Sequence, residues 1–157
     1  MEFGGYFPGA IGQLTGLHAV YYHQHWDFDL SFEAQVSSEL AEFLSRFDPE
    51  RDFFCTAEQD GRLMGAVAID HSAEGGPRLR WLIVDEAQQG QGLGAKLISE
   101  AIEFCRTAGH KKVHLWTFEG LGAARALYER NGFSLVQERQ GDKWGSSPNE
   151  QKFELQL

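Results

Sequence analysis

The sequence predicts a mixed α/β fold, in which one central, mostly antiparallel sheet carries helices on both faces. Apolar residues recur at helical spacing in segments 31–47 and 92–107, which indicates two amphipathic helices. Segments 62–70 and 79–84 are apolar on both faces, as strands covered on both sides are. A hairpin followed by strand–helix–strand–helix–strand accounts for a single domain over residues 1–157.

The segment before the hairpin predicts mostly helix. We expect a short strand over 9–14 and an aromatic, His-rich helix over 17–26. The clearest early helix is 31–47, which Ser31 can cap and which Asp48-Pro49 ends. The N-terminal third of the chain is therefore expected to supply a helix pair that covers the sheet.

From residue 53 onward, strands and helices alternate. Asp60-Gly61, between the expected strands 53–58 and 62–70, predicts a type I′ turn, because both central residues of such a turn need positive φ. The remaining expected elements are strands over 79–84, 113–118, 133–138 and 151–157, with helices over 92–107 and 123–130.

The composition excludes several classes of function. Of 157 residues, 42% are apolar and 24% charged, as in ordinary globular proteins. The formal net charge of −9 argues against partners such as nucleic acid or an anionic membrane surface. The N-terminus has no signal-peptide pattern, and two isolated cysteines favour free thiols in a reducing cytoplasm. The scattered histidines and cysteines lack metal-ligand spacing, so we expect no metal site.

A Gly-rich turn joins a buried strand to a helix over residues 81–97. The first N–H groups of a helix have no internal partners, and the helix dipole is positive there. Gly90, Gly92 and Gly94 carry no side chain that would keep a ligand away from those N–H groups. The junction therefore predicts an anion cradle suited to a pyrophosphate.

Two classes of ligand fit such a cradle. Gly90-x-Gly92-x-x-Ala95 formally matches the dinucleotide fingerprint G-x-G-x-x-G/A. Against it, no strand–helix–strand unit opens the sheet, and only 38 residues follow Glu119, too few for the second half of a dinucleotide fold. A phosphate-loop NTPase is excluded, because no G-x-x-x-x-G-K-[ST] occurs. Coenzyme A is the second class.

Two motifs, in order, resemble those of the GNAT acyltransferase superfamily. Residues 89–94, Gln-Gly-Gln-Gly-Leu-Gly, resemble its Q/R-x-x-G-x-G/A motif, and the strand Leu82-Ile83-Val84-Asp85 precedes it as in that family. Residues 123–133 resemble the closing signature A-x-x-L-Y-x-x-x-G-F, with Ala124 as its alanine and Tyr128 as its tyrosine. The resemblance covers about residues 53–157, and the first 50 residues are compatible with the variable helix pair of the family.

A closer resemblance is to the acetyltransferase half of bacterial proteins that fuse a MarR-type DNA-binding domain to a GNAT domain. It is carried by segments 25–29, 32–34, 79–84, 115–118 and 144–145. The elements of the catalytic domain account for the whole sequence, so we expect a free-standing relative without a DNA-binding domain.

The resemblance implies an N-acetyltransferase that moves an acetyl group from acetyl-CoA to a primary amine by direct attack, without a metal. It implies a V-shaped splay between strands 79–84 and 113–118 that admits the thioester. It also implies that Tyr128 protonates the departing thiolate, a role that suits a phenol near sulfur. The residues implied to bind the cofactor are Leu82, Ile83 and Val84 along the pantetheine arm and Gln89, Gly90, Gln91, Gly92, Leu93, Gly94 and Ala95 around the pyrophosphate.

The sequence departs from the family pattern at three places. Gln89 stands where an arginine is common, so backbone and dipole bind the phosphates with less help from charge unless Lys96 compensates. Leu121 replaces an asparagine often found seven residues before the tyrosine. The strand before the motif carries Arg78 and Arg80 where many members place a glutamate base.

The general base and the acceptor are therefore open. Glu119 and Asp70, at strand ends, are candidates for the base, and either is alternatively a capping or solvated carboxylate. The helix pair walls the acceptor site in this family, and here its aromatic and acidic residues form either such a wall or part of the core. These residues are Tyr21, Tyr22, His25, Trp26, Asp27 and Asp29.

An aromatic and acidic wall predicts a cationic acceptor, either a small-molecule amine or a peptide amine. The alternative function is a non-catalytic acyl-CoA-binding sensor or interaction module. The sequence leaves open whether the chain forms a homodimer and whether acyl groups other than acetyl are used.

Overall fold

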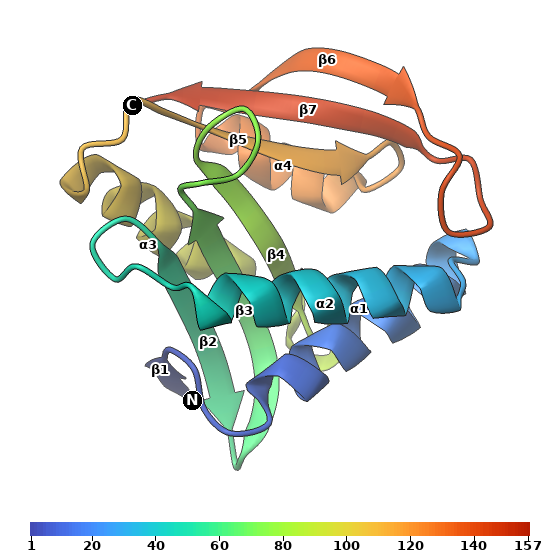
Figure 1. Ribbon diagram of the computed structural model, residues 1–157, viewed down its shortest axis with the longest axis horizontal. Coiled ribbons are helices and arrows are strands. Elements are labelled where there is room, and N and C mark those ends of the chain that lie inside the picture. The colour runs from blue at the N-terminus through green and yellow to red at the C-terminus, as the bar shows by residue number, and fades with distance from the viewer.

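The computed structural model describes residues 1–157 and has seven strands, four α-helices and one 3₁₀ helix, η1 (Figure 1). In chain order the elements are β1 (Glu2–Gly4), α1 (Ala10–Trp26), α2 (Leu30–Ser45), β2 (Phe53–Gln59), β3 (Arg62–Asp70), β4 (Arg78–Val84), η1 (Glu86–Gln88), α3 (Leu93–Thr107), β5 (Lys112–Phe118), α4 (Gly122–Arg130), β6 (Ser134–Gln140) and β7 (Asn149–Gln156).

One sheet contains every strand, in the order β1-β2-β3-β4-β5-β7-β6. All neighbouring strands are antiparallel except β4 and β5, which confirms the predicted mixed, mostly antiparallel sheet. The parallel pair shares a single paired position, Arg78 opposite His114. Beyond it β4 and β5 diverge, so β1–β4 and β5–β7 form two half-sheets that run in different directions (Figure 1).

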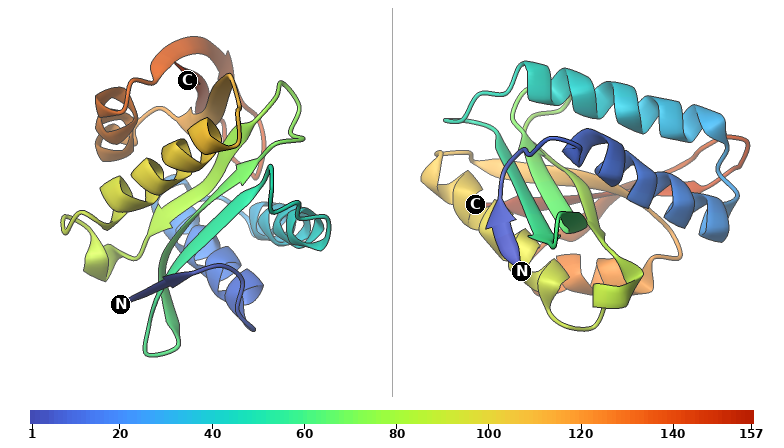
Figure 2. Two further views of the ribbon diagram at one scale, coloured as in Figure 1. Left: turned by 90° about the vertical axis from the view of Figure 1, so that its left-hand side faces the viewer. Right: turned by 90° about the horizontal axis from the view of Figure 1, so that it is seen from below.

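The helices lie on both faces of the sheet (Figure 2). On one face, α3 buries Leu97, Ile98 and Ala101 completely in the larger of the apolar clusters, to which α4 also contributes. On the other face, α1 and α2 bury Leu14 and Phe43 against β2 and β3. Each fully buried leucine or phenylalanine contributes about 1.5–3 kcal/mol to the free energy of folding. None of the helices has the length and apolar character needed to cross a membrane.

The N-terminal segment differs from the sequence prediction. The expected strand over 9–14 is wrong: α1 already begins at Ala10, after Gly9 in the left-handed region with φ 96°. The first strand is β1 instead, paired with β2 at the edge of the sheet. The expected helix 17–26 is the second half of α1. The cap of α2 also differs, because the carboxylate of Asp29, rather than Ser31, accepts a backbone N–H, that of Ser31 itself.

The later elements agree with the prediction to within two residues at each boundary. The type I′ turn between β2 and β3 is confirmed, with φ 53° at Asp60 and 76° at Gly61. Gly92 is the cap of α3 rather than its first residue, again with positive φ. The segment that the sequence singled out therefore has the predicted form of strand, tight Gly-rich turn and helix.

Candidate active site

The N-terminus of α3 is open to a ligand. Gly92 caps the helix with φ 85°, Gly90 has φ 79°, and no side chain caps the helix. The first intrahelical bond runs from the N–H of Lys96 to the carbonyl of Gly92, 3.0 Å, which leaves the N–H groups of residues 93–95 without partners in the helix. A Cβ at Gly90 or Gly92 would meet no atom within 4 Å, so the space in front of these groups is free. This arrangement fits a pyrophosphate.

Polar side chains fix the loop that leads into this turn. Asp85 caps η1 by accepting the N–H of Ala87, 2.9 Å, and its other oxygen lies 3.0 Å from Nη2 of Arg62. The side-chain amide of Gln89 donates to the carbonyl of Val84, 3.2 Å. Gln89, in place of the family arginine, thus holds the loop rather than adding charge to the cradle.

Lys96 does not supply the missing charge. Its ammonium lies 4.7 Å from the ring centre of Phe3 and 3.8 Å from Oε1 of Glu100, both outside the cradle. The cation that does line the space beside the cradle is Arg130, which is exposed at the end of α4. The sequence signal for it lies in the closing signature, where Arg130 is the second residue after the tyrosine.

A cavity of about 660 Å³, called here the α3 cavity, runs from the cradle along β4 to α4. Nine of the ten residues predicted to bind the cofactor line it; the tenth, Gln91, turns its side chain toward the carbonyl of Ala87, 3.5 Å. The other lining residues, which the sequence did not assign to the cofactor, come from α1, from η1 and from the segment 120–130. They are Tyr21, Tyr22, His25, Trp26, Gln88, Gly120, Leu121, Gly122, Ala123, Ala124, Leu127, Tyr128 and Arg130.

The end of β4 presents a free backbone edge to this cavity. Ile83 and Val84 pair with β3 on one side, whereas β5 pairs with β4 only at Arg78. Trp81 adopts φ 54°, an unusual value for a non-glycine residue, opposite an irregularity in the β3 register. The backbone groups of residues 82–84 that face β5 are therefore available to an extended ligand, in the manner of an added strand.

A second cavity, called here the α2 cavity, lies between α2 and the strands β4 and β5 and has a volume of about 150 Å³. Residues of α1, α2, β4, β5, α4 and the β6–β7 loop line it, and most of them are apolar. They are His18, Tyr22, Phe32, Gln35, Val36, Glu39, Arg78, Leu79, Arg80, Trp81, Leu82, Leu115, Trp116, Thr117, Phe118, Tyr128 and Trp144. Three of them, Tyr22, Leu82 and Tyr128, also line the α3 cavity, so the two cavities meet at the splay between β4 and β5.

Tyr128 stands at this meeting point. Its side chain is buried, 6% exposed, and its ring centre lies 6.1 Å from those of Phe133 and Phe153. Burial raises the pKa of the phenol to about 12, so the hydroxyl keeps its proton at neutral pH. No protein group hydrogen-bonds the hydroxyl, which is therefore free to donate to a ligand.

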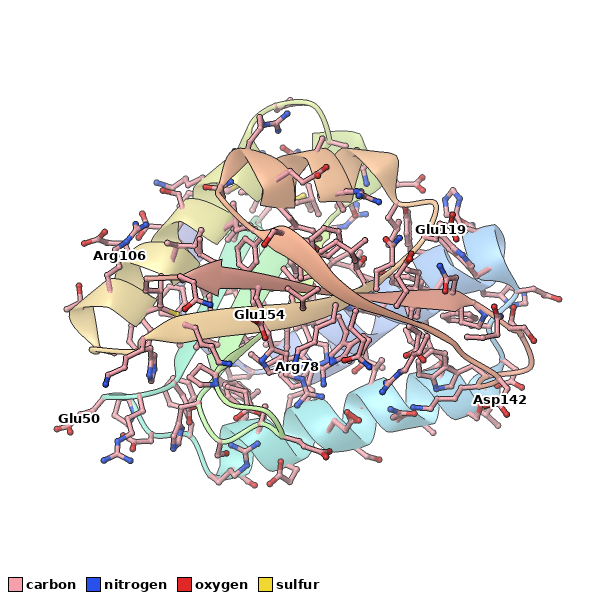
Figure 3. All side chains as sticks on the ribbon, turned by 90° about the horizontal axis from the view of Figure 1, so that it is seen from above. Glu50, Arg78, Arg106, Glu119, Asp142 and Glu154 are labelled. Carbon is pink, nitrogen blue, oxygen red and sulfur yellow. The ribbon has the colours of Figure 1, made fainter.

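The carboxylates named as candidate bases lie outside both cavities. Asp70 accepts hydrogen bonds from Arg46, at 3.0 and 3.1 Å, and from Arg80, at 3.2 Å. Burial acts to raise the pKa of Asp70, but these arginines outweigh it and hold the pKa below its usual value. Glu119 follows the end of β5 at the rim of the molecule, where it accepts the side-chain N–H of Asn149, 2.9 Å (Figure 3). Neither carboxylate is placed to deprotonate an amine in the α2 cavity.

Within the α2 cavity, His18 is the neutral proton acceptor. Its Nδ1 lies 3.0 Å from the carbonyl of Leu14, and with the proton on Nδ1 the Nε2 atom is left as an acceptor. Burial lowers the pKa of the imidazole to about 4. Glu39, by contrast, already accepts hydrogen bonds from Nη2 of Arg80, 2.6 Å, and from the side-chain amide of Gln35, 3.1 Å.

The aromatic and acidic cluster of the helix pair divides between several roles. Tyr22 alone lines both cavities, whereas Tyr21, His25 and Trp26 line only the α3 cavity. The two acidic members lie outside both: the side chain of Asp27 is 92% exposed, and Asp29 caps α2. Asp27 and Asp29 therefore form no acidic wall around either cavity.

Comparisons with known proteins agree with this geometry. Residues 17–133 match the sequence profile of the acetyltransferase (GNAT) family. The mycothiol acetyltransferase of Beutenbergia cavernae is 32% identical over 90 residues, which cover 57% of this chain but only 30% of that protein. An acetyltransferase of Agrobacterium fabrum is 30% identical over 111 residues, covering 69% of this chain and 80% of that protein.

A solved structure shares the fold over the whole chain. The structure of YncA from Salmonella typhimurium, with its cofactor acetyl-CoA, has a TM-score of 0.74 at 20% identity. The match covers 100% of this chain and 94% of that one. At this level of identity, the likeness establishes the common fold.

Proposed function

Since the chain belongs to the acetyltransferase (GNAT) family, we propose that it transfers an acetyl group from acetyl-CoA to a primary amine by direct attack. One observation carries the proposal: two cavities, which share Tyr22, Leu82 and Tyr128, meet at the splay between β4 and β5, beside a protonated phenol. The α3 cavity takes acetyl-CoA, and the α2 cavity takes the amine. No metal is required.

The backbone supplies most of the cofactor contacts. The N–H groups of residues 90–95 hold the pyrophosphate, helped by the positive end of the α3 dipole, whereas the N–H of Gln89 already donates to the carbonyl of Glu86. The free edge of residues 82–84 pairs with the amides of the pantetheine arm, and Arg130 adds a cation at the mouth of the cavity. Bound in this way, acetyl-CoA supplies an activated acyl group, a thioester, at the splay.

The side chains at the splay handle the protons. Tyr128 donates its hydroxyl proton, or a strong hydrogen bond, to sulfur as the thiolate departs. His18, neutral at pH 7, accepts a hydrogen bond from the amine and orients its lone pair. An imidazole with a pKa of about 4 is a weak base, so the proton of the amine leaves to water.

Release of thiol from acetyl-CoA tests the proposal. A panel of amines, amino acids and short peptides should contain acceptors that release CoA, and the rate should fall in Tyr128→Phe. Acetyl-CoA binding without thiol release from any acceptor would instead favour the acyl-CoA sensor or interaction module. Tight NAD binding without acetyl-CoA binding would contradict the cofactor assignment.

We further propose that the acetyltransferase halves of MarR–GNAT fusion proteins are functional counterparts of this chain. Trp81 and Trp144 belong to the segments that carry this resemblance, and both line the α2 cavity. We place the reaction in the cytoplasm, a location supported by two buried cysteines that are both free. Sedimentation equilibrium decides between a monomer and a homodimer.

A further inference from the structure

Arg78 is a cation of the α2 cavity that has no partner. Its side chain makes no hydrogen bond and no ion pair, and its Nε donor is buried without an acceptor. Figure 3 shows Arg78 between helix α2 and the strands of the β5–β7 half-sheet. Arg78 is thus placed at the inner wall of the cavity rather than in open solvent.

The carboxylates nearest to Arg78 are already engaged by other arginines. Arg80, two residues further along β4, places Nη2 at 2.6 Å from Oε1 of Glu39 and Nη1 at 3.2 Å from Oδ2 of Asp70. Glu39 and Asp70 are also the carboxylates that act on the pKa of Arg78. Their negative charge is therefore largely neutralised before it reaches Arg78.

The charges next to Trp116, a lining residue of the cavity, are also balanced. Arg139 of β6 lies over the ring of Trp116, 4.1 Å from its centre, and its Nε is 3.1 Å from Oε2 of Glu150. Arg139 opposes the charge of Arg78, whereas Glu150 is held by Arg139. The cavity thus carries one positive charge that no carboxylate of the protein pairs with, and Glu39 and Asp70 act on it only from a distance.

Arg78 is half-buried; a guanidinium partly withdrawn from water without an anion is unfavourable, and the buried, unpaired Nε donor adds to the cost. Burial lowers the pKa of Arg78 to about 10, so the group is still charged at neutral pH. A guanidinium presents its donors in a planar fork that matches the two oxygens of a carboxylate. One free positive charge matches one carboxylate, whereas a phosphate monoester carries about −1.5 to −2.

We propose that Arg78 binds the carboxylate of the acceptor, and that the acceptors are small amino carboxylates whose apolar part lies against the tryptophans of the α2 cavity. This inference rests on the proposed function, since it treats the α2 cavity as the acceptor site. The cavity volume of about 150 Å³ suits a small molecule rather than a peptide segment. The expected preference for cationic acceptors is reversed, because Asp27 and Asp29 lie outside the cavity and Arg78 lies inside it.

Matched acceptors test the inference on the unaltered protein. Amino carboxylates with small, aliphatic and aromatic side chains are compared with their amides and their decarboxylated amines, by thiol release from acetyl-CoA. We expect kcat/KM to be about tenfold or more higher for the preferred carboxylate than for its amide. Equal or faster turnover of the amides, or turnover of amines in the absence of turnover of any amino carboxylate, would overturn the inference.

Two variants of Arg78 and a matched control assign the effect to this residue. Arg78→Met keeps the apolar stem and should remove the preference for the carboxylate, while Arg78→Lys keeps the charge but loses the fork and should retain part of it. Arg106→Met removes an exposed charge on α3, remote from Arg78, and should leave the preference unchanged (Figure 3). A preference that survives intact in folded Arg78→Met would refute the assignment.

A binding measurement separates this inference from the proposed function. Three of the four tryptophans line the α2 cavity, so their fluorescence reports occupancy. 3-Phenylpropionate should bind about tenfold more tightly than 3-phenylpropionamide, and Arg78→Met should abolish the difference. Selective binding of the acid without any thiol release would refute the acetyltransferase proposal and keep the carboxylate site. Thiol release without selectivity for the carboxylate in either assay would refute the carboxylate site and keep the acetyltransferase proposal.

Discussion

Replacing Tyr128 by phenylalanine removes one hydroxyl from the point where the two cavities meet. The ring keeps its contacts with Phe133 and Phe153, and the hydroxyl has no protein partner to lose. The free energy of unfolding should therefore change by less than about 0.5 kcal/mol. The affinity for acetyl-CoA should also be nearly unchanged, because a neutral thioester sulfur is a weak hydrogen-bond acceptor.

The expected loss of turnover follows from the pKa of the phenol. That pKa is raised by burial to about 12, whereas an ordinary thiol has a pKa of about 8.5. Full proton transfer to the thiolate would thus be uphill by about 5 kcal/mol, since each pKa unit is worth about 1.4 kcal/mol. What Tyr128 supplies is mainly a hydrogen bond to a developing negative charge, worth about 1.5–3 kcal/mol. We expect kcat to fall by about 10- to 150-fold.

Initial rates of thiol release, at saturating acetyl-CoA and with an established acceptor, measure this effect. Tyr6→Phe is the matched control, because Tyr6 is exposed and lines neither the α2 nor the α3 cavity. Calorimetry on both variants gives the affinity for acetyl-CoA. The raised pKa also predicts that kcat does not decline through ionisation of Tyr128 between about pH 8 and pH 10.

The reasoning fails if folded Tyr128→Phe turns over at the parental rate under conditions in which chemistry limits kcat. Tyr128 would then be a packing residue of the larger apolar cluster. An equal loss of acetyl-CoA affinity and turnover would also contradict it, because the hydroxyl would then act in the ground state.

Four further outcomes are expected. Acetyl-CoA should raise the melting temperature by mass action, equally well after treatment with a chelator, and a loss of the effect on chelation would indicate a metal. Gly92→Val should abolish acetyl-CoA binding in calorimetry. Gly109, at the other end of α3, has a similar positive φ, so Gly109→Val is the control: each variant should lose about 1–2 kcal/mol of stability, but Gly109→Val should leave binding unchanged. Burial lowers the pKa of His18 from 6.5 to about 4, so the contribution of the neutral imidazole to the free energy of unfolding should be complete above pH 6.5. That free energy should fall by about 3 kcal/mol as the pH decreases from 6.5 to about 4, and urea titrations of His18→Leu should show a shallower fall. Without an acceptor, Arg78→Met should raise the melting temperature by about 3 °C, as expected for about 1 kcal/mol; a lower melting temperature would mean that the charge is compensated.

The sequence predicted the parts of the fold that short-range patterns encode. Asp60-Gly61 predicted the hairpin because two consecutive positive φ values restrict the residue choice strongly. Gly90 and Gly92 predicted the cradle because they carry no side chain that would cover the N–H groups of the helix N-terminus, and both have positive φ in the structure. The helix α1 was partly missed because its apolar, aromatic and polar residues do not segregate to one face, so that its first turns show no clear helical period.

The composition of the site was less predictable, because it depends on contacts between distant segments. Nothing near Asp70 in the sequence indicates that Arg46, from the end of α2, neutralises it. Arg78 and Arg80 look equivalent on their strand, yet one has two carboxylate partners and the other has none. That difference arises from the placement of Glu39 by α2, which no local pattern in β4 encodes.

The divergence of β4 and β5 also has a consequence for how the protein unfolds. A single paired position joins the two half-sheets through the backbone, so side-chain packing beneath the helices, rather than a continuous hydrogen-bond ladder, couples them. In hydrogen exchange, the amides of β3 and of β7 should therefore report separable opening reactions. A ligand that spans the gap contacts both halves at once, and its binding should merge those openings into one cooperative event. Because β4 and β5 diverge to admit a substrate, the cooperativity with which the two half-sheets unfold depends on whether a ligand occupies the gap between them.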